Sequence, residues 1–135
     1  MFNKGGNAFD AALAAAFAET VWLPMKCGLA GDIVALYKRP GEPVRTLLAI
    51  GRGPLALTQG AALAATGPCS IGGAGAPEGY ARLAGYGDLP FKTLLEPAIR
   101  MAQDGVRWTP VAVRLTEESE ALLRQWNGDI PYLPN

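Results

Sequence analysis

The sequence predicts an α+β fold in which helices cover at least one face of a small sheet. Three observations indicate this fold: an alanine-rich helical segment near the start, two strand-like segments joined by a tight turn, and several helical segments after them. The chain has 135 residues, which is the length of one domain. Half of the residues are hydrophobic, so the chain can bury a core.

The first helix is expected over residues 8–22, where alanine, the residue with the highest helix propensity, is most frequent. Asn7 is a suitable N-cap, and Asp10 stands at the third helical position, where it gives a variant of the capping box. One apolar face is marked, at a spacing of four, by Leu13, Phe17 and Val21. The small side chains would let this helix lie close to a sheet or to another helix.

A β-hairpin is expected next, because residues 32–38 and 44–50 are rich in strand-forming side chains. Residues 39–43, "RPGEP", form the turn between them. The run "LLAI" at the end of the second strand is almost continuously apolar, which predicts that both faces of the sheet are covered. Two strands do not make a stable sheet core alone, so we expect further strands from elsewhere.

The remaining helices are read from their proline and glycine residues. Residues 60–66 are a helix candidate, residues 67–79 read as a long shaped loop, and a helical pattern runs from Pro77 to about Gly85. Pro97 fits the first position of a helix that runs to Gln103, after a separate helical turn at residues 91–95.

Two further signals bound the last helices. Gly105 is a suitable C-terminal cap for the helix that precedes it. Thr109 and Pro110 give an N-cap and a first position for a helix over residues 110–126. The apolar positions of that helix include Val113, Leu115, Leu122 and Trp126.

Composition excludes several classes of function. The chain has 12 basic and 12 acidic residues and no basic stripe, so a nucleic-acid partner is not expected. No apolar run reaches the roughly 20 residues of a membrane span, and the sequence gives no targeting information. Histidine is absent, which excludes nucleophilic triads that use histidine and metal sites that contain histidine. No cofactor is expected. Cys27 and Cys69 are expected to be reduced, partly buried thiols.

Two segments could carry chemistry. The loop "CGLAGD", residues 27–32, is either a tight helix-to-strand connection or a place where backbone approaches a ligand closely, and composition favours the first. The loop "GGAGAPEG", residues 72–79, lacks the Lys-Ser/Thr of a phosphate-binding P-loop. Neither segment by itself identifies a ligand.

Arg52 is the candidate binding residue. It directly follows the second predicted strand and stands between Gly51 and Gly53. Its guanidinium could make a bidentate pair with a carboxylate of a ligand, or it could be a structural ion-pair partner, which is the more frequent role of such a residue.

Several blocks together resemble the large subunit of γ-glutamyltranspeptidases. The block "KGGNAFDAALAAAF" is similar to that family's "KGGNAVDAAVAAA" signature, and the later blocks follow in the family's order. These later blocks are "CGLAGDIVALY" (27–37), "GRGPLA" (51–56) and "YGDLPFKTLLEPAIRMAQDGVRWTP" (86–110). The resemblance extends at least from Lys4 to Leu133.

The resemblance implies an N-terminal nucleophile hydrolase, a four-layer αββα sandwich whose precursor cleaves itself into two subunits. The nucleophile would be the N-terminal Thr of a partner small subunit, with its own α-amino group as the base. The substrate would be a small amide, possibly γ-glutamyl. By motif position, Arg52 would pair with the α-carboxylate of the acyl donor, and no catalytic residue would lie in this chain.

The same comparison leaves alternatives. The family's glycine-rich stretch is here "GLAGD", with an Asp32 that is familiar in acylase-like branches, so a member that cleaves a non-γ-glutamyl amide in secondary metabolism is one alternative. The family's large subunit usually begins before and continues beyond the matching blocks, so residues 1–135 are expected to be a single partial domain. A truncated, non-catalytic relative that acts as an interaction domain is the other alternative.

Overall fold

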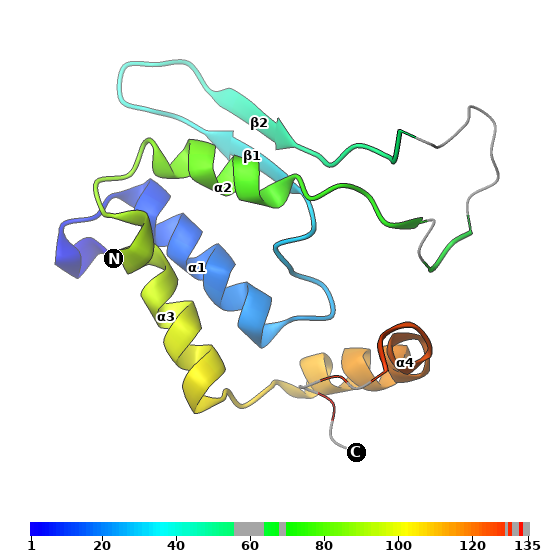
Figure 1. Cartoon of the computed structure of the whole chain (residues 1–135). Coiled ribbons are helices and arrows are strands. Elements are labelled where there is room, and N and C mark those ends of the chain that lie inside the picture. Colours follow the sequence, from blue (N-terminus) through cyan, green and yellow to red (C-terminus); the bar gives the residue numbers. More distant parts are fainter. Residues whose placement is uncertain (56–63, 68–69, 129, 131–132, 134–135) are drawn as a thin grey trace.

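The computed structural model describes residues 1–55, 64–67, 70–128, 130 and 133. It is a mixed α+β structure, as the sequence predicts (Figure 1). Its elements are, in order, η1 (Phe2–Lys4), α1 (Ala8–Trp22), β1 (Ile33–Tyr37), β2 (Arg45–Ala49), α2 (Ala76–Ala84), α3 (Phe91–Asp104) and α4 (Pro110–Asn127). No described helix is both long and apolar enough to cross a membrane.

The two strands form the predicted antiparallel hairpin, with Ile33 opposite Ala49 and Tyr37 opposite Arg45. Side chains alternate along each strand, so every second one faces the helices. The opposite face carries Val34, Leu36 and Leu48, and these side chains are exposed. The expectation that both faces are covered is therefore not met by the described residues, because no described segment lies over this second face.

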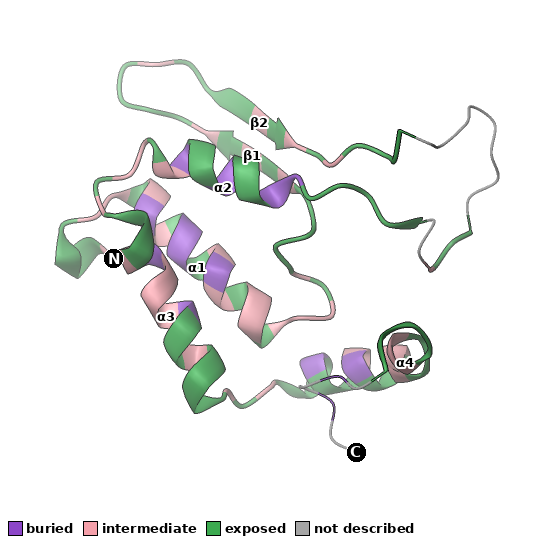
Figure 2. Cartoon of the chain, viewed as in Figure 1, coloured by how far each residue is buried: buried purple, intermediate pink, exposed green. Residues whose placement is uncertain are grey.

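The core lies where α1, α2 and α3 meet below the covered face of the hairpin (Figure 2). It is built from Leu13, Phe17, Ala76, Tyr80, Leu83, Leu94 and Ala98. The aromatic rings interlock, with the centroid of Phe17 4.7 Å from that of Tyr80 and 5.4 Å from that of Phe91. The apolar face predicted for the first helix is thus confirmed.

The closest approach of a helix to the sheet occurs at α2. A Cβ placed on Gly79 would lie 2.8 Å from the Cβ of Ala49 and 3.3 Å from that of Ile33, so only a glycine allows this spacing. The alanines of α1 have a different role, since Ala12 and Ala16 line a shallow apolar groove of about 310 Å³ between α1 and β1. Glycine on α2, rather than alanine on α1, sets the spacing between helix and sheet.

One predicted helix boundary is wrong. Pro97 does not begin a helix but lies inside α3, which is continuous from Phe91 to Asp104. A proline inside a helix removes one backbone hydrogen bond and crowds the preceding turn. Here α3 buries Leu94 and Ala98 against the core on either side of Pro97, and this packing offsets the cost.

The predicted caps are confirmed. Gly105 ends α3 with a φ of 78°, and the Thr109 hydroxyl accepts a hydrogen bond of 3.2 Å from the Ala112 amide at the start of α4. Residues 64–66 are not helical, and residues 60–63 of the same helix candidate lie outside the described residues. Cys27 is a free, half-buried thiol, as expected, whereas Cys69 lies outside the described residues.

Candidate functional site

The start of α1 is a structural clamp between two distant segments. The Asn7 side chain accepts hydrogen bonds from the amides of Phe9 (2.8 Å) and Asp10 (3.3 Å), and Asp10 Oδ2 accepts from the Asn7 amide (2.8 Å). This is the predicted capping box. The same carboxylate also accepts from the amides of Asp88 (2.9 Å, to Oδ2) and Leu89 (3.2 Å, to Oδ1). Asp10 thereby joins the helix start to the turn that precedes α3.

The Asp10 carboxyl is completely buried and stays charged. Burial raises its pKa, but the hydrogen bonds from the backbone amides of Asp88, Asn7 and Leu89 together lower it by more than burial raises it. The pKa therefore lies below its ordinary value of 3.8. Glycine makes the close approach possible, because a Cβ on Gly87 would overlap Asp10 Oδ1. The carboxylate is occupied by backbone donors, so this motif holds the fold and presents no group to a substrate.

The candidate site lies at the end of the hairpin opposite its turn, where β2 ends and β1 begins. Arg52 follows β2 by three residues, and its side chain is exposed. Its carbonyl accepts a hydrogen bond of 2.9 Å from the Gly73 amide. The amide of Gly51, directly before it, donates to Asp32 Oδ1 at 2.7 Å. The backbone on both sides of the Arg52 side chain is therefore held.

Both glycine-containing loops noted in the sequence meet at this point. The Gly31 carbonyl accepts hydrogen bonds from the amides of Gly75 (3.1 Å) and Ala76 (2.8 Å), which ties the first loop to the start of α2. A Cβ on Gly51 would overlap the Gly73 carbonyl, so these two backbones are in direct contact. The glycines thus allow three chain segments to converge around Arg52.

The Arg52 guanidinium has no ion-pair partner among the described residues, whose ion pairs use other basic side chains. A structural ion pair, the alternative role considered for Arg52, therefore finds no support in the described part of the chain. An exposed guanidinium on a fixed backbone can bind a carboxylate in bidentate fashion. Sequence reasoning did not single out Asp32 or Gly73 as the residues that hold it. The hairpin register could have placed Asp32 there.

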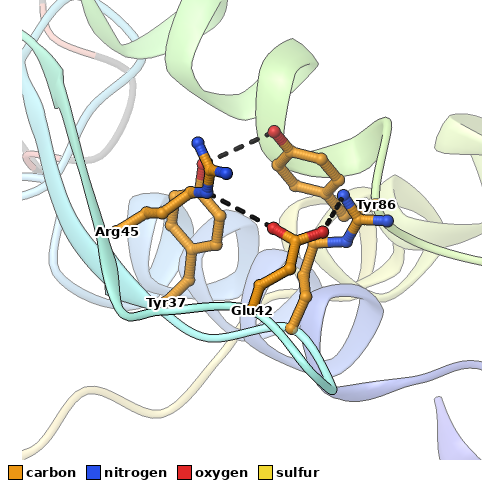
Figure 3. Close-up of polar contacts among 5 residues, drawn as sticks. Tyr37, Glu42, Arg45 and Tyr86 are labelled. Atoms are coloured by element: carbon orange, nitrogen blue, oxygen red, sulfur yellow. Dashed lines mark hydrogen bonds and ion pairs between the residues drawn. The ribbon is translucent and has the colours of Figure 1, made fainter.

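A second polar cluster lies at the hairpin turn, and Figure 3 shows its side chains. Glu42 forms ion pairs with Arg39 (2.9 Å) and Arg45 (3.3 Å). The hydroxyls of Tyr37 and Tyr86 lie 3.4 Å apart, and this hydrogen bond is the main cause that raises the pKa of Tyr37 above 10.0. The charges of the two arginines are already shared with Glu42, so this cluster is a weaker candidate for ligand binding than Arg52.

The described residues hold no group of three or more Asp, Glu, Cys or His side chains placed to bind a metal ion.

Comparison with known proteins shows the family to which the chain is similar. The family described as Gamma-glutamyltranspeptidase matches residues 1–132. Over 126 residues the chain is 32% identical to glutathione hydrolase proenzyme 2 of Schizosaccharomyces pombe, an alignment that covers 89% of this chain and 21% of that protein. The chain thus spans about a fifth of the length of this curated relative.

Solved structures of this family and of an acylase also match the chain. The γ-glutamyltranspeptidase of Helicobacter pylori matches with a TM-score of 0.85 and 25% identity, over 93% of this chain and 39% of that one. The cephalosporin acylase of Bacillus halodurans matches with a TM-score of 0.84 and 34% identity, over 96% of this chain and 26% of that one. The fold is that of N-terminal nucleophile hydrolases, in which processing into two subunits is typical. This chain belongs to the γ-glutamyltranspeptidase family.

Proposed function

We propose that this chain is the large-subunit portion of a γ-glutamyltranspeptidase-like amide hydrolase or acyltransferase, and that it shapes the acyl-donor pocket. The observation that carries the proposal is Arg52. Its guanidinium is exposed and without an ion-pair partner among the described residues, while the backbone around it is held by hydrogen bonds to Asp32 and Gly73. Family membership supports the reaction class.

In this proposal the chain binds and orients the donor, and a partner small subunit supplies the N-terminal Thr. The Thr hydroxyl oxygen attacks the amide carbonyl, and the α-amino group of the same Thr takes the hydroxyl proton. The amide C–N bond breaks, the leaving amine takes up that proton, and an ester to Thr remains. Water or a second amine then attacks the ester, which completes hydrolysis or transfer.

The role of Arg52 is orientation. Two parallel N–H···O bonds from a guanidinium to a carboxylate fix direction as well as distance. A donor held in this way presents its scissile carbonyl to the nucleophile in one geometry, and such positioning is a large part of enzymatic rate enhancement.

A second candidate is an acylase that cleaves a non-γ-glutamyl amide. It is favoured by the 34% identity to the cephalosporin acylase, compared with 25% to the Helicobacter transpeptidase. Both candidates give Arg52 the same carboxylate-binding role, and they differ in the rest of the acyl group. A panel of γ-glutamyl, glutaryl and larger acyl amides would distinguish them by their kcat/KM values.

The test uses the protein purified from its native source, together with any co-purifying chain, after editing of the gene. Arg52→Ala is expected to raise the donor KM at least tenfold, and Arg52→Lys is expected to restore little, because a lysine supplies a point charge without the planar fork. Arg100→Ala, an exposed arginine on α3, is the matched control and should leave the donor KM unchanged.

Two results would overturn the proposal. One is an unchanged donor KM and kcat in Arg52→Ala. The other is the lack of any co-purifying chain that begins with Thr, combined with no activity on any amide of the panel, which would favour the non-catalytic interaction domain.

A further inference from the structure

We propose that Asp32 is a positioning residue that fixes the place of Arg52 through the Gly51 amide. This inference rests on the proposed carboxylate-binding role of Arg52. Asp32 stands directly before β1, and its Oδ1 accepts a hydrogen bond of 2.7 Å from the amide that immediately precedes Arg52. The side chain acts on Arg52 through the backbone, since no ion pair joins the two side chains.

The hairpin register explains why a side chain is needed here. Ile33 lies opposite Ala49, so continuing the register by two residues places Gly31 opposite Gly51. In a longer ladder the Gly31 carbonyl could accept from the Gly51 amide. That carbonyl is instead turned to the amides of Gly75 and Ala76 at the start of α2. The Gly51 amide donates instead to the Asp32 carboxylate.

The use of the Asp32 carboxylate as the acceptor for the Gly51 amide determines where the chain leaves the sheet. With Gly51 bound to a side chain rather than to the neighbouring strand, β2 ends at Ala49 and Arg52 lies in a loop. The loop is fixed a second time by the hydrogen bond of 2.9 Å from the Gly73 amide to the Arg52 carbonyl. The Cα of Arg52 is thus held between two hydrogen bonds, one from the Gly51 amide to the Asp32 side chain and one from the Gly73 amide to the Arg52 carbonyl.

Contact between Gly51 and Gly73 limits where the loop that carries Arg52 can lie. A Cβ on Gly51 would overlap the Gly73 carbonyl, so the loop cannot move toward residue 73. Other movements of the loop are opposed by the hydrogen bond from the Gly51 amide to Asp32 and by the one from the Gly73 amide to the Arg52 carbonyl. Loss of the Asp32 acceptor should therefore leave the Arg52 backbone held on the Gly73 side only. A displacement of about 1 Å can cost roughly a hundredfold in rate when it misplaces a substrate-binding group.

The role makes a specific prediction for two substitutions. Asp32→Asn keeps an acceptor oxygen at the same position, whereas Asp32→Ala removes it. If Asp32 acts as an acceptor for the Gly51 amide, the Asn variant should stay close to the wild type. If its negative charge acted directly on the substrate, Asn and Ala would be equally damaging.

The experiment measures kcat and KM for the acyl donor with Asp32→Ala, Asp32→Asn, Arg52→Ala and the double variant Asp32→Ala/Arg52→Ala in the purified holoenzyme. Asp32→Ala is expected to raise the donor KM roughly ten- to a hundredfold. Asp32→Asn should remain within about threefold of the wild type, and Asp32→Ala should have no further effect in the Arg52→Ala background. Hydrogen exchange of the Gly51 amide should be faster in Asp32→Ala than in Asp32→Asn.

The inference is overturned if Asp32→Ala leaves the donor KM unchanged, if Asp32→Asn is as damaging as Asp32→Ala, or if the effects of Asp32→Ala and Arg52→Ala multiply. If Arg52→Ala has an effect and any of these results is found, only the role of Asp32 is refuted, and the proposed function stands. An Arg52→Ala variant without effect refutes the proposed function instead. If Asp32→Ala does not fold, Asp32→Glu moves the acceptor by one methylene group and must raise the donor KM for the inference to stand.

Discussion

Replacing Asp10 with asparagine should destabilise the protein strongly, although the two side chains have the same shape. Asp10 Oδ2 accepts hydrogen bonds from the amides of Asn7 and Asp88, and Oδ1 accepts from the amide of Leu89. Both oxygens of this buried carboxylate therefore accept hydrogen bonds from backbone amides. An asparagine NH₂ group placed at either oxygen position would point at one or two of these N–H groups.

The magnitude follows from this geometry. In its better orientation, Asp10→Asn directs its NH₂ toward the Leu89 amide, which is then a buried donor without a partner and costs about 1–3 kcal/mol. The two remaining hydrogen bonds change from charged to neutral ones, a loss of about 1 kcal/mol each. We therefore expect a loss of about 3–5 kcal/mol in the free energy of unfolding, a large part of the total for a domain.

The pKa of Asp10 adds a pH dependence. Because the folded-state pKa is lowered, the charged carboxylate stabilises the fold fully above its ordinary pKa of 3.8, and this contribution is lost as the pH falls through the lower folded value. The Asp10→Asn variant lacks this contribution, so its stability should vary less with pH in the acid range than that of the wild type.

The assay is urea unfolding of the purified protein, combined with hydrogen exchange of the segments around residues 7 and 88. Asp104→Asn, at the exposed end of α3, is the matched control and should unfold within about 0.5 kcal/mol of the wild type. The reasoning is refuted if Asp10→Asn is as stable as the control, or if the amides of Asp88 and Leu89 keep their wild-type protection.

Three further predictions concern other parts of the chain. Gly79→Val should lower the unfolding free energy by about 1–3 kcal/mol in urea titrations, because its Cβ would crowd Ala49; an unchanged midpoint would contradict the close approach of α2. Leu36→Lys, on the exposed face of the hairpin, should reduce the recovery of co-purifying chains in a pull-down, and full recovery would show that this face stays uncovered. Tyr86→Phe should lower the titration midpoint of Tyr37 in ultraviolet difference spectra, since the hydrogen bond that raises its pKa is removed; an equal or higher midpoint would exclude that cause.

Local signals in the sequence predicted the local structure well. The N-cap at Asn7, the cap at Thr109 and the hairpin over β1 and β2 are all present. Each of these depends on residues that are close in sequence, so propensity and spacing are sufficient to find them. The family resemblance, carried by blocks of matching residues, supplied the expectation of an N-terminal nucleophile hydrolase fold.

Contacts between distant segments were not predicted. Asp10 was recognised as part of a capping box, but its hydrogen bonds to residues 78 and 79 positions later depend on how the turn before α3 folds back. Pro97 was placed at a helix start because propensity disfavours it inside a helix, and tertiary packing of Leu94 and Ala98 overrides that preference.

One of the two residues of the candidate site, Arg52, could be predicted from the sequence, and the role of the other, Asp32, could not. Arg52 stood out because it follows a strand between two glycines, and the structure places it in an exposed loop with its backbone held. Asp32 was noted only as a family variation. Its bond to the Gly51 amide becomes visible when the hairpin register and the orientation of the Gly31 carbonyl are known together.

The central claim is that Arg52 binds the carboxylate of the acyl donor, and one comparison tests it directly. We would measure kcat/KM for a γ-glutamyl anilide and for the 4-aminobutanoyl anilide, which differs only by lacking the α-carboxylate, with the wild type and with Arg52→Ala. The account predicts that the wild type prefers the γ-glutamyl compound at least tenfold and that Arg52→Ala loses this preference. A preference that is equally large in both proteins would contradict it.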